Sequence, residues 1–80
     1  MKNIDKGLDP YEALANAIIV QAAQDVRVAY KAIKRNPKNY TAQRTIDEVE
    51  KFFNSAWFEA LTDVEGSYLI RKLREEAGLE

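Results

Sequence analysis

The sequence predicts an all-α fold: a small helical bundle in which a long first helix forms an antiparallel hairpin with the second. A short third helix and a closing fourth helix follow. Apolar residues recur every three to four positions through most of the 80 residues. Asn36-Pro37 interrupts this pattern with residues that end helices. No segment sustains the apolar–polar alternation of a half-buried strand, so we expect no sheet.

The first helix is expected over residues 10–35. Asp9 offers an N-cap carboxylate and Pro10 suits the first helical position. Asn36-Pro37 then ends a helix about 39 Å long. Its apolar positions form two adjacent stripes: Tyr11, Ala15, Ile18, Ala22, Ala29 and Ile33 in one, and Ile19, Ala23, Val26 and Tyr30 in the other. A face this wide is typical of a helix that packs against two neighbours.

A second helix is expected over residues 40–53, and a short third helix, capped by Ser55, over residues 55–61. The inner face of the second helix comprises Ala42, Ile46, Val49 and Phe53. We expect this helix to lie along the C-terminal half of the first.

The fourth helix is expected over residues 63–77. Thr62 and Glu65 have the spacing of a capping box, and Gly78 is a typical helix stop. Gly66 in the first turn costs about 1 kcal/mol relative to alanine. The inner face of this helix is predicted to comprise Val64, Tyr68, Leu69, Leu73 and Ala77.

We expect residues 1–80 to form one helical domain, with residues 1–8 flexible. The fourth helix should cover part of the N-terminal half of the first. If that cover is incomplete, an apolar patch would be exposed and would favour a symmetric homodimer. The patch would consist of Tyr11, Leu14, Ala15 and Ile18.

The composition argues against an enzyme. The chain has no histidine and no cysteine, which excludes the usual neutral-pH acid–base group and the thiol nucleophile. The sequence also lacks a glycine-rich phosphate loop and a convincing set of metal ligands. We therefore predict no catalytic residue, no cofactor and no metal. Neither a signal peptide nor a membrane span is evident, so a cytoplasmic location without membrane contact is expected.

Charge is unevenly distributed, although the formal net charge is only −1. Residues 27–44 carry six cations and no acid: Arg27, Lys31, Lys34, Arg35, Lys38 and Arg44. Residues 47–65 carry six acids and one lysine. One interpretation is a corner that contacts the phosphates of nucleic acid or another acidic partner. The other is a solvated face whose Arg27 and Lys31 pair with Asp47 and Glu48 on the next helix.

Four aromatic residues lie within seven positions: Phe52, Phe53, Trp57 and Phe58. Rings of this size are usually buried, so we expect them where the helices meet. Trp57 is the candidate exception, because its indole N–H needs a polar partner or solvent. Tyr11, Tyr30 and Tyr40 share this ambivalence at helix edges. Together with Tyr11 and Leu14, Trp57 is a candidate residue of a protein interface.

Residues 52–74, from Phe52-Phe53 to Leu73-Arg74, also carry a likeness to a known group of proteins. With Ala15-Asn16-Ala17-Ile18 and Asn36-Pro37, this segment resembles small helical proteins of unassigned function from phages and prophages of Gram-positive bacteria. The likeness covers roughly residues 11–77. It implies a viral or prophage origin, and hence the cytoplasm of the bacterial host, but no activity and no site residues.

Three functional hypotheses follow. The first is a non-enzymatic phage or prophage protein that binds another protein, such as a host factor in defence or host takeover. The second is a nucleic-acid-binding accessory protein that uses the basic corner at residues 27–44. The third is a structural homo-oligomer.

Overall fold

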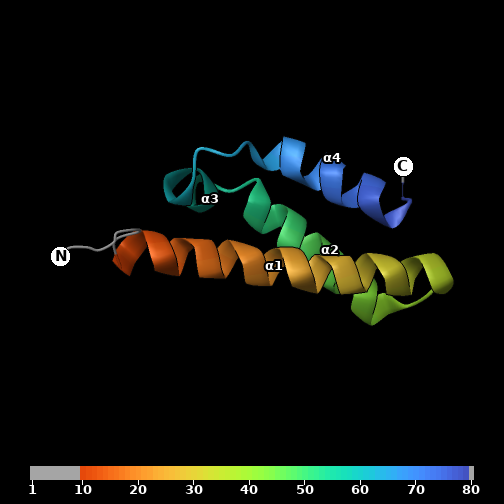
Figure 1. Ribbon diagram of the computed structural model, residues 1–80. Coiled ribbons are helices and arrows are strands. Elements are labelled where there is room, and N and C mark those ends of the chain that lie inside the picture. Colours follow the sequence, from red (N-terminus) through yellow and green to blue (C-terminus); the bar gives the residue numbers. More distant parts are fainter. Residues whose placement is uncertain (1–9, 80) are drawn as a thin grey trace.

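The computed structural model describes residues 10–79 and confirms the all-α prediction, with no strand in this part of the chain. The helices are α1 (Pro10–Arg35), α2 (Tyr40–Phe53), α3 (Ala56–Leu61) and α4 (Gly66–Ala77). Figure 1 shows α1 as the long base of the molecule, with α2 crossing it obliquely and α3 and α4 above it. The predictions for residues 1–8 and for an Asp9 cap lie outside the described residues.

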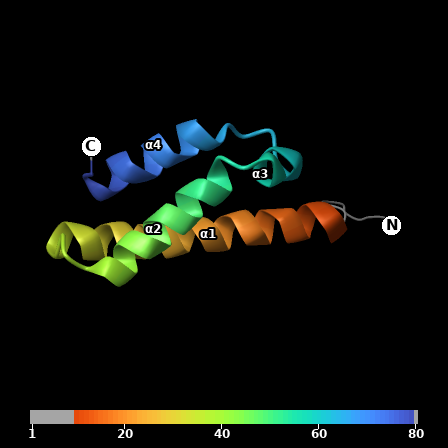
Figure 2. The same ribbon diagram turned by 180° about the vertical axis from the view of Figure 1, so that it is seen from behind.

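The predicted hairpin of α1 and α2 is present, and local polar groups shape its corner. The Asn39 backbone N–H donates to the Asn36 carbonyl oxygen over 3.0 Å, which closes the turn after α1. The Asn39 side chain then caps α2 by accepting from the Ala42 N–H, also over 3.0 Å. Figure 2 shows α2 running back along the C-terminal half of α1 and crossing it obliquely.

Ser55 connects α2 to α3 and confirms the predicted cap. Its hydroxyl donates to the Phe52 carbonyl oxygen over 2.6 Å and accepts from the Phe58 N–H over 3.1 Å. The short helix α3 therefore turns away directly after α2 and buries Phe58 completely. It lies over the N-terminal half of α1 (Figure 1).

The predicted start of the fourth helix is wrong: α4 begins at Gly66, and the capping box does not form. Thr62 has an extended backbone and ends α3, where its N–H donates to the Phe58 carbonyl oxygen. Its hydroxyl accepts from the Val64 N–H, which makes a local turn instead of a helix cap. The Glu65 side chain makes no cap hydrogen bond, although Glu65 is the N-cap residue of α4.

Gly66 is required by packing, which the sequence did not predict. A Cβ atom at this position would collide with the Phe53 carbonyl oxygen and would lie 2.8 Å from the carbonyl carbon. Without a side chain, the first turn of α4 sits directly on the backbone at the end of α2. At the other end of α4, Gly78 adopts the left-handed conformation with φ of 77° and confirms the predicted stop.

The predicted position of the fourth helix is also wrong. Figures 1 and 2 show α4 above the C-terminal half of α1, while α3 takes the place over the N-terminal half. The extended connection between α3 and α4 reverses the chain, so α4 runs in the same direction as α1. Ion pairing between Arg27 and Glu76 joins the two helices over 3.2 Å.

The core lies where α1, α2, α3 and α4 meet. Tyr30, Phe53, Phe58 and Val26 are its largest fully buried side chains. The predicted inner face of α2 is confirmed, with Ala42, Ile46 and Phe53 buried and Val49 partly buried. On α4, Leu73 is buried and Leu69 and Ala77 are partly buried. Val64 and Tyr68 are exposed, contrary to prediction, because Val64 precedes α4 and Tyr68 faces away from the core.

Candidate functional site

A shallow groove of about 370 Å³ lies between α1 and α2 and ends at α3. We call it the α1–α2 groove. Its lining residues are Ile18, Gln21, Ala22 and Asp25 of α1, Glu48, Val49 and Phe52 of α2, and Trp57 of α3. The walls are mainly apolar, and the two charged lining residues are both acids. The sequence placed Val49 on the inner face of α2 and Ala22 on the apolar face of α1. Ile18 belonged to that face and also to the apolar patch that incomplete cover would expose, because helical spacing does not distinguish a core face from a groove face.

Trp57 is held firmly and is still exposed. Its ring meets the edge of the Phe52 ring at a centroid distance of 5.4 Å, and Phe52 in turn contacts the rings of Phe53 and Phe58. The residue nevertheless keeps 59% of its surface accessible. Among the four clustered aromatic residues, Phe53 and Phe58 are buried as predicted, and Trp57, the candidate exception, is exposed.

The other two candidate interface residues do not line the groove. Leu14 is exposed one turn before Ile18, on the same face of α1. Tyr11 is exposed as well, and it lines a separate hollow between α1 and the segment that follows α3. The expectation that Ala15 would be exposed with them is wrong: it is 2% exposed, because it lies on the buried stripe of α1.

On α1 and α3, the described residues that flank the groove include acids and no base. Residues 10–26 and 54–66 form the N-terminal part of α1, α3 and the connection to α4, and together they hold five acids and no base. We call this region the acidic end. Its acids are Glu12, Asp25, Glu59, Asp63 and Glu65. A ligand that approaches this end therefore meets a negative potential over an apolar surface.

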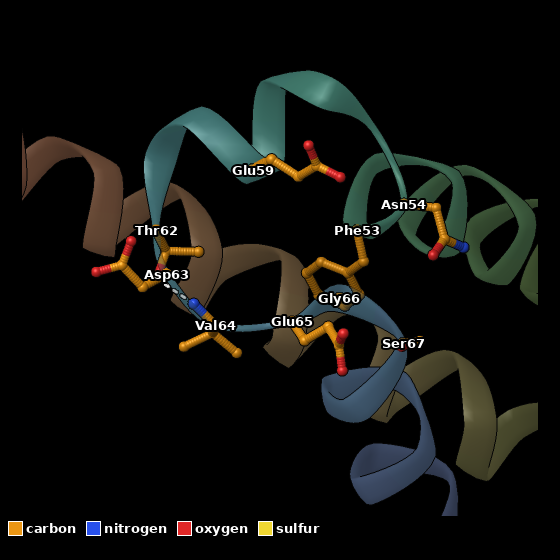
Figure 3. A pocket seen from close by; sticks show the side chains of 9 residues that line it. All are labelled: Phe53, Asn54, Glu59, Thr62, Asp63, Val64, Glu65, Gly66 and Ser67. Carbon is orange, nitrogen blue, oxygen red and sulfur yellow. Dashed lines mark hydrogen bonds between the residues drawn. The ribbon is translucent and has the colours of Figure 1, made fainter.

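A third hollow lies between the ends of α2 and α3 and the start of α4 (Figure 3). Phe53 and Gly66 line it, and the carboxylates of Glu59 and Glu65 lie at its border. Within residues 10–79, no group of three or more acidic side chains is arranged to hold a metal ion.

The six cations of the basic corner are all exposed. The expected pairing of Arg27 and Lys31 with Asp47 and Glu48 is wrong. Arg27 instead pairs with Glu76, because α4 lies beside it, and Asp47 accepts a hydrogen bond from Gln43 on its own helix.

The remaining cations of the basic corner have little internal compensation. Lys34 donates to the Ala77 carbonyl oxygen at the end of α4 over 3.4 Å, which is a partner that the sequence did not suggest. In the described part of the chain, no ion pair involves the other four: Lys31, Arg35, Lys38 and Arg44. The structure thus leaves a local concentration of positive charge facing solvent.

Tyr40 lies within the basic corner along the chain and was not named as a site residue from the sequence. It is 81% exposed at the first position of α2, between Lys38 and Arg44 along the chain. A signal was present in the sequence, since Tyr40 lies off the stripe of Ala42, Ile46 and Phe53 that forms the inner face. An aromatic ring off the inner face has nothing of its own helix to pack against.

Comparison with known proteins gives no further assignment. The chain matches no protein-family model, no curated protein and no solved structure. Among the described helices, none combines the length and the apolar character needed to cross a lipid bilayer.

Proposed function

We propose that this chain is a phage or prophage protein that acts without catalysis, by binding another protein through the α1–α2 groove. Trp57 is the observation that carries the proposal, because a large aromatic side chain is fixed at the end of an apolar groove and left open to solvent. The proposed origin is based on the likeness of residues 52–74 to phage-encoded proteins. That origin makes a protein of the bacterial host the proposed partner.

Energetics favour Trp57 as an anchor. A buried tryptophan removes roughly 150–250 Å² from water, so covering its exposed part would contribute about 3 kcal/mol. The edge-on contact with Phe52 already holds the indole in place. Little conformational entropy would then be lost on binding, which is a property of interface hot spots.

Affinity capture with matched variants tests this function. The full chain is used as bait in lysates of Gram-positive bacteria, beside Trp57→Glu and a control, Val20→Glu. Val20 is a 52% exposed apolar residue of α1 that does not line the groove. Circular dichroism confirms that both variants are folded. We expect a protein that the wild type and Val20→Glu recover and that Trp57→Glu loses. Recovery of the same proteins by all three baits, or of none, would contradict the proposal.

A second candidate function is supported by the basic corner. Within the described residues, the corner combines Tyr40, which is 81% exposed, with four cations that make no ion pair. Cations contact phosphates and release counterions, while an exposed ring gives an unpaired base a surface to stack on. This combination favours single-stranded nucleic acid over a duplex, whose bases are already stacked.

A further inference from the structure

We infer that the α1–α2 groove receives an amphipathic helix whose apolar face is bordered by lysine or arginine. This inference depends on the proposed protein-binding function and specifies the chemistry of the partner. It is drawn from the shape of the groove, from its position between two helices and from the sign of its charges.

The shape of the groove favours a helical occupant. Along α1, Leu14, Ile18 and Ala22 follow one another at intervals of four residues, so they form one ridge on one face. Along α2, Val49 and Phe52 form the facing wall. α1 and α2 cross obliquely, as Figure 2 shows, and the groove forms a trough between their facing side chains. A third helix fills such a trough by placing its own ridge of apolar side chains into it.

The charges of the groove determine the kind of helix. Asp25 on α1 and Glu48 on α2 line it from opposite walls, and Gln21 donates to the Asp25 carboxylate over 2.9 Å. No lysine or arginine is among the lining residues. A docking helix therefore gains from cations on both sides of its apolar face, and an anionic helix is repelled.

The same charges disfavour a second copy of this chain as the occupant. A two-fold dimer through the groove would place two acidic ends together and bring the Asp25 and Glu48 carboxylates of both copies into one interface. Like charges in a partly desolvated interface destabilise it. The charges of the groove therefore favour a positively charged partner over a second copy of this chain.

Binding can be measured by the fluorescence of Trp57, because it is the only tryptophan of the chain. The probe is a 14-residue peptide of leucine, lysine and alanine without aromatic residues, with leucines spaced to form one helical face. A second peptide of the same composition has a permuted order without that face. A third replaces lysine by glutamate. Covering the indole should shift its emission to shorter wavelength, and titration gives Kd at physiological salt.

We expect a saturable shift with the first peptide and none with the other two. Asp25→Lys combined with Glu48→Lys should weaken binding about tenfold, as loss of two charge pairs implies. Asp63→Lys combined with Glu65→Lys changes the net charge equally, outside the groove, and should leave Kd within about twofold because salt screens distant charges.

Several outcomes would overturn the inference. Equal binding of the permuted peptide, or equal weakening by the two double variants, would show attraction by net charge alone. Another such outcome is a shift of the Trp57 emission to shorter wavelength when the concentration of the protein alone is raised. If sedimentation then shows a dimer, and Ile18→Glu abolishes it, the occupant of the groove is a second copy of the chain. If no peptide binds while Trp57-dependent capture of a protein persists, the proposed function stands and the helical, cationic occupant is wrong.

Discussion

The Tyr30 hydroxyl of α1 donates a hydrogen bond of 2.5 Å to Glu50 Oε2 of α2. Arg74 of α4 donates to the same oxygen through Nε at 2.9 Å and Nη2 at 2.7 Å. Its guanidinium also lies 5.5 Å from the centre of the Tyr30 ring. One carboxylate thus joins three helices at the edge of the core, where hydrogen bonds to a charged group are stronger than between neutral groups.

Tyr30→Phe tests this junction through its pH dependence. Burial raises the pKa of the Tyr30 hydroxyl, and the bond to Glu50 raises it further. In the unfolded chain the hydroxyl ionises near pH 10, so above that pH the unfolded state loses a proton that the folded state keeps. The stability due to Tyr30 is complete below about pH 10 and is lost as pH rises toward the folded-state pKa.

We therefore expect Tyr30→Phe to lower the free energy of unfolding by about 1.5–3 kcal/mol at pH 7. The difference from wild type should shrink by about 1.4 kcal/mol per pH unit above pH 10. Urea denaturation of both proteins at pH 7, 10 and 11 measures it. A difference that stays constant to pH 11 would show that the hydroxyl is not preferentially protonated in the folded state.

Glu50→Gln and Glu76→Gln form a matched pair, because each removes a carboxylate that pairs with an arginine. The Glu50 side chain is 21% exposed and accepts from two residues, whereas the Glu76 side chain is 56% exposed and pairs with Arg27 alone. We expect Glu50→Gln to cost about 1–3 kcal/mol and Glu76→Gln less than about 0.5 kcal/mol. Chemical denaturation in 0.15 M salt gives both values, and equal losses would contradict the structural difference.

Gly66→Ala should destabilise the protein although alanine is the better helix former. Its Cβ would collide with the Phe53 carbonyl group, and forced repacking of this kind costs about 1–3 kcal/mol. Ser67→Ala, at the exposed next position, serves as the control and should change stability by less than about 0.5 kcal/mol. Thermal unfolding followed by circular dichroism compares the two. A more stable Gly66→Ala protein would mean that α4 does not approach α2 so closely.

Tyr40→Ala tests the second candidate function. Base stacking on an aromatic ring contributes about 1–3 kcal/mol, so affinity for single-stranded oligonucleotides should fall about 5- to 150-fold. Affinity for a duplex should be unchanged. Lys31→Glu should weaken both, while Lys51→Glu, with the same charge change outside the basic corner, should have a smaller effect. Absence of gel retardation of wild type at low salt would exclude this function.

Collisional quenching of Trp57 reports the potential around the groove without any partner. Because the acidic end attracts cations, caesium should quench the emission more efficiently than iodide, relative to a free tryptophan derivative. The preference should diminish in Asp25→Lys combined with Glu48→Lys. A preference for iodide in the wild type would show that the basic corner, and not the acidic end, dominates the field at the indole.

Features governed by neighbouring residues in the chain were predictable. The bounds of α1 and α2 follow from Pro10, Asn36-Pro37 and the Asn39 cap, and the Ser55 cap acts within a single turn. Each of these signals works over three or four residues, so no tertiary information is needed. The polar requirement of the indole N–H made Trp57 a candidate for exposure, but the same argument applied to Tyr30, which is fully buried, so it did not decide the outcome.

Features that depend on distant contacts were not predictable. Thr62 and Glu65 have the spacing of a capping box, but the Thr62 hydroxyl accepts from the Val64 N–H and forms a local turn instead. The sequence pattern alone does not distinguish a helix cap from this turn. The position of α4 follows from that turn. It gives Arg27 a partner on α4, where the hairpin alone suggested α2. Likewise, glycine is required at position 66 only because the Phe53 carbonyl group lies against it, and Phe53 is 13 positions earlier in the sequence.

The separation of charge along α1 has a consequence for how this protein meets other molecules. The acids near α3 and the cations near the α1–α2 corner occupy opposite ends of a body that measures 51 × 21 × 20 Å. With a formal net charge of −1, attraction or repulsion of the whole molecule is weak, but charged surfaces of opposite sign lie at the two ends of the described part of the chain. We therefore expect a polyanion to approach the end with the basic corner, so that Trp57, at the other end, faces away from it.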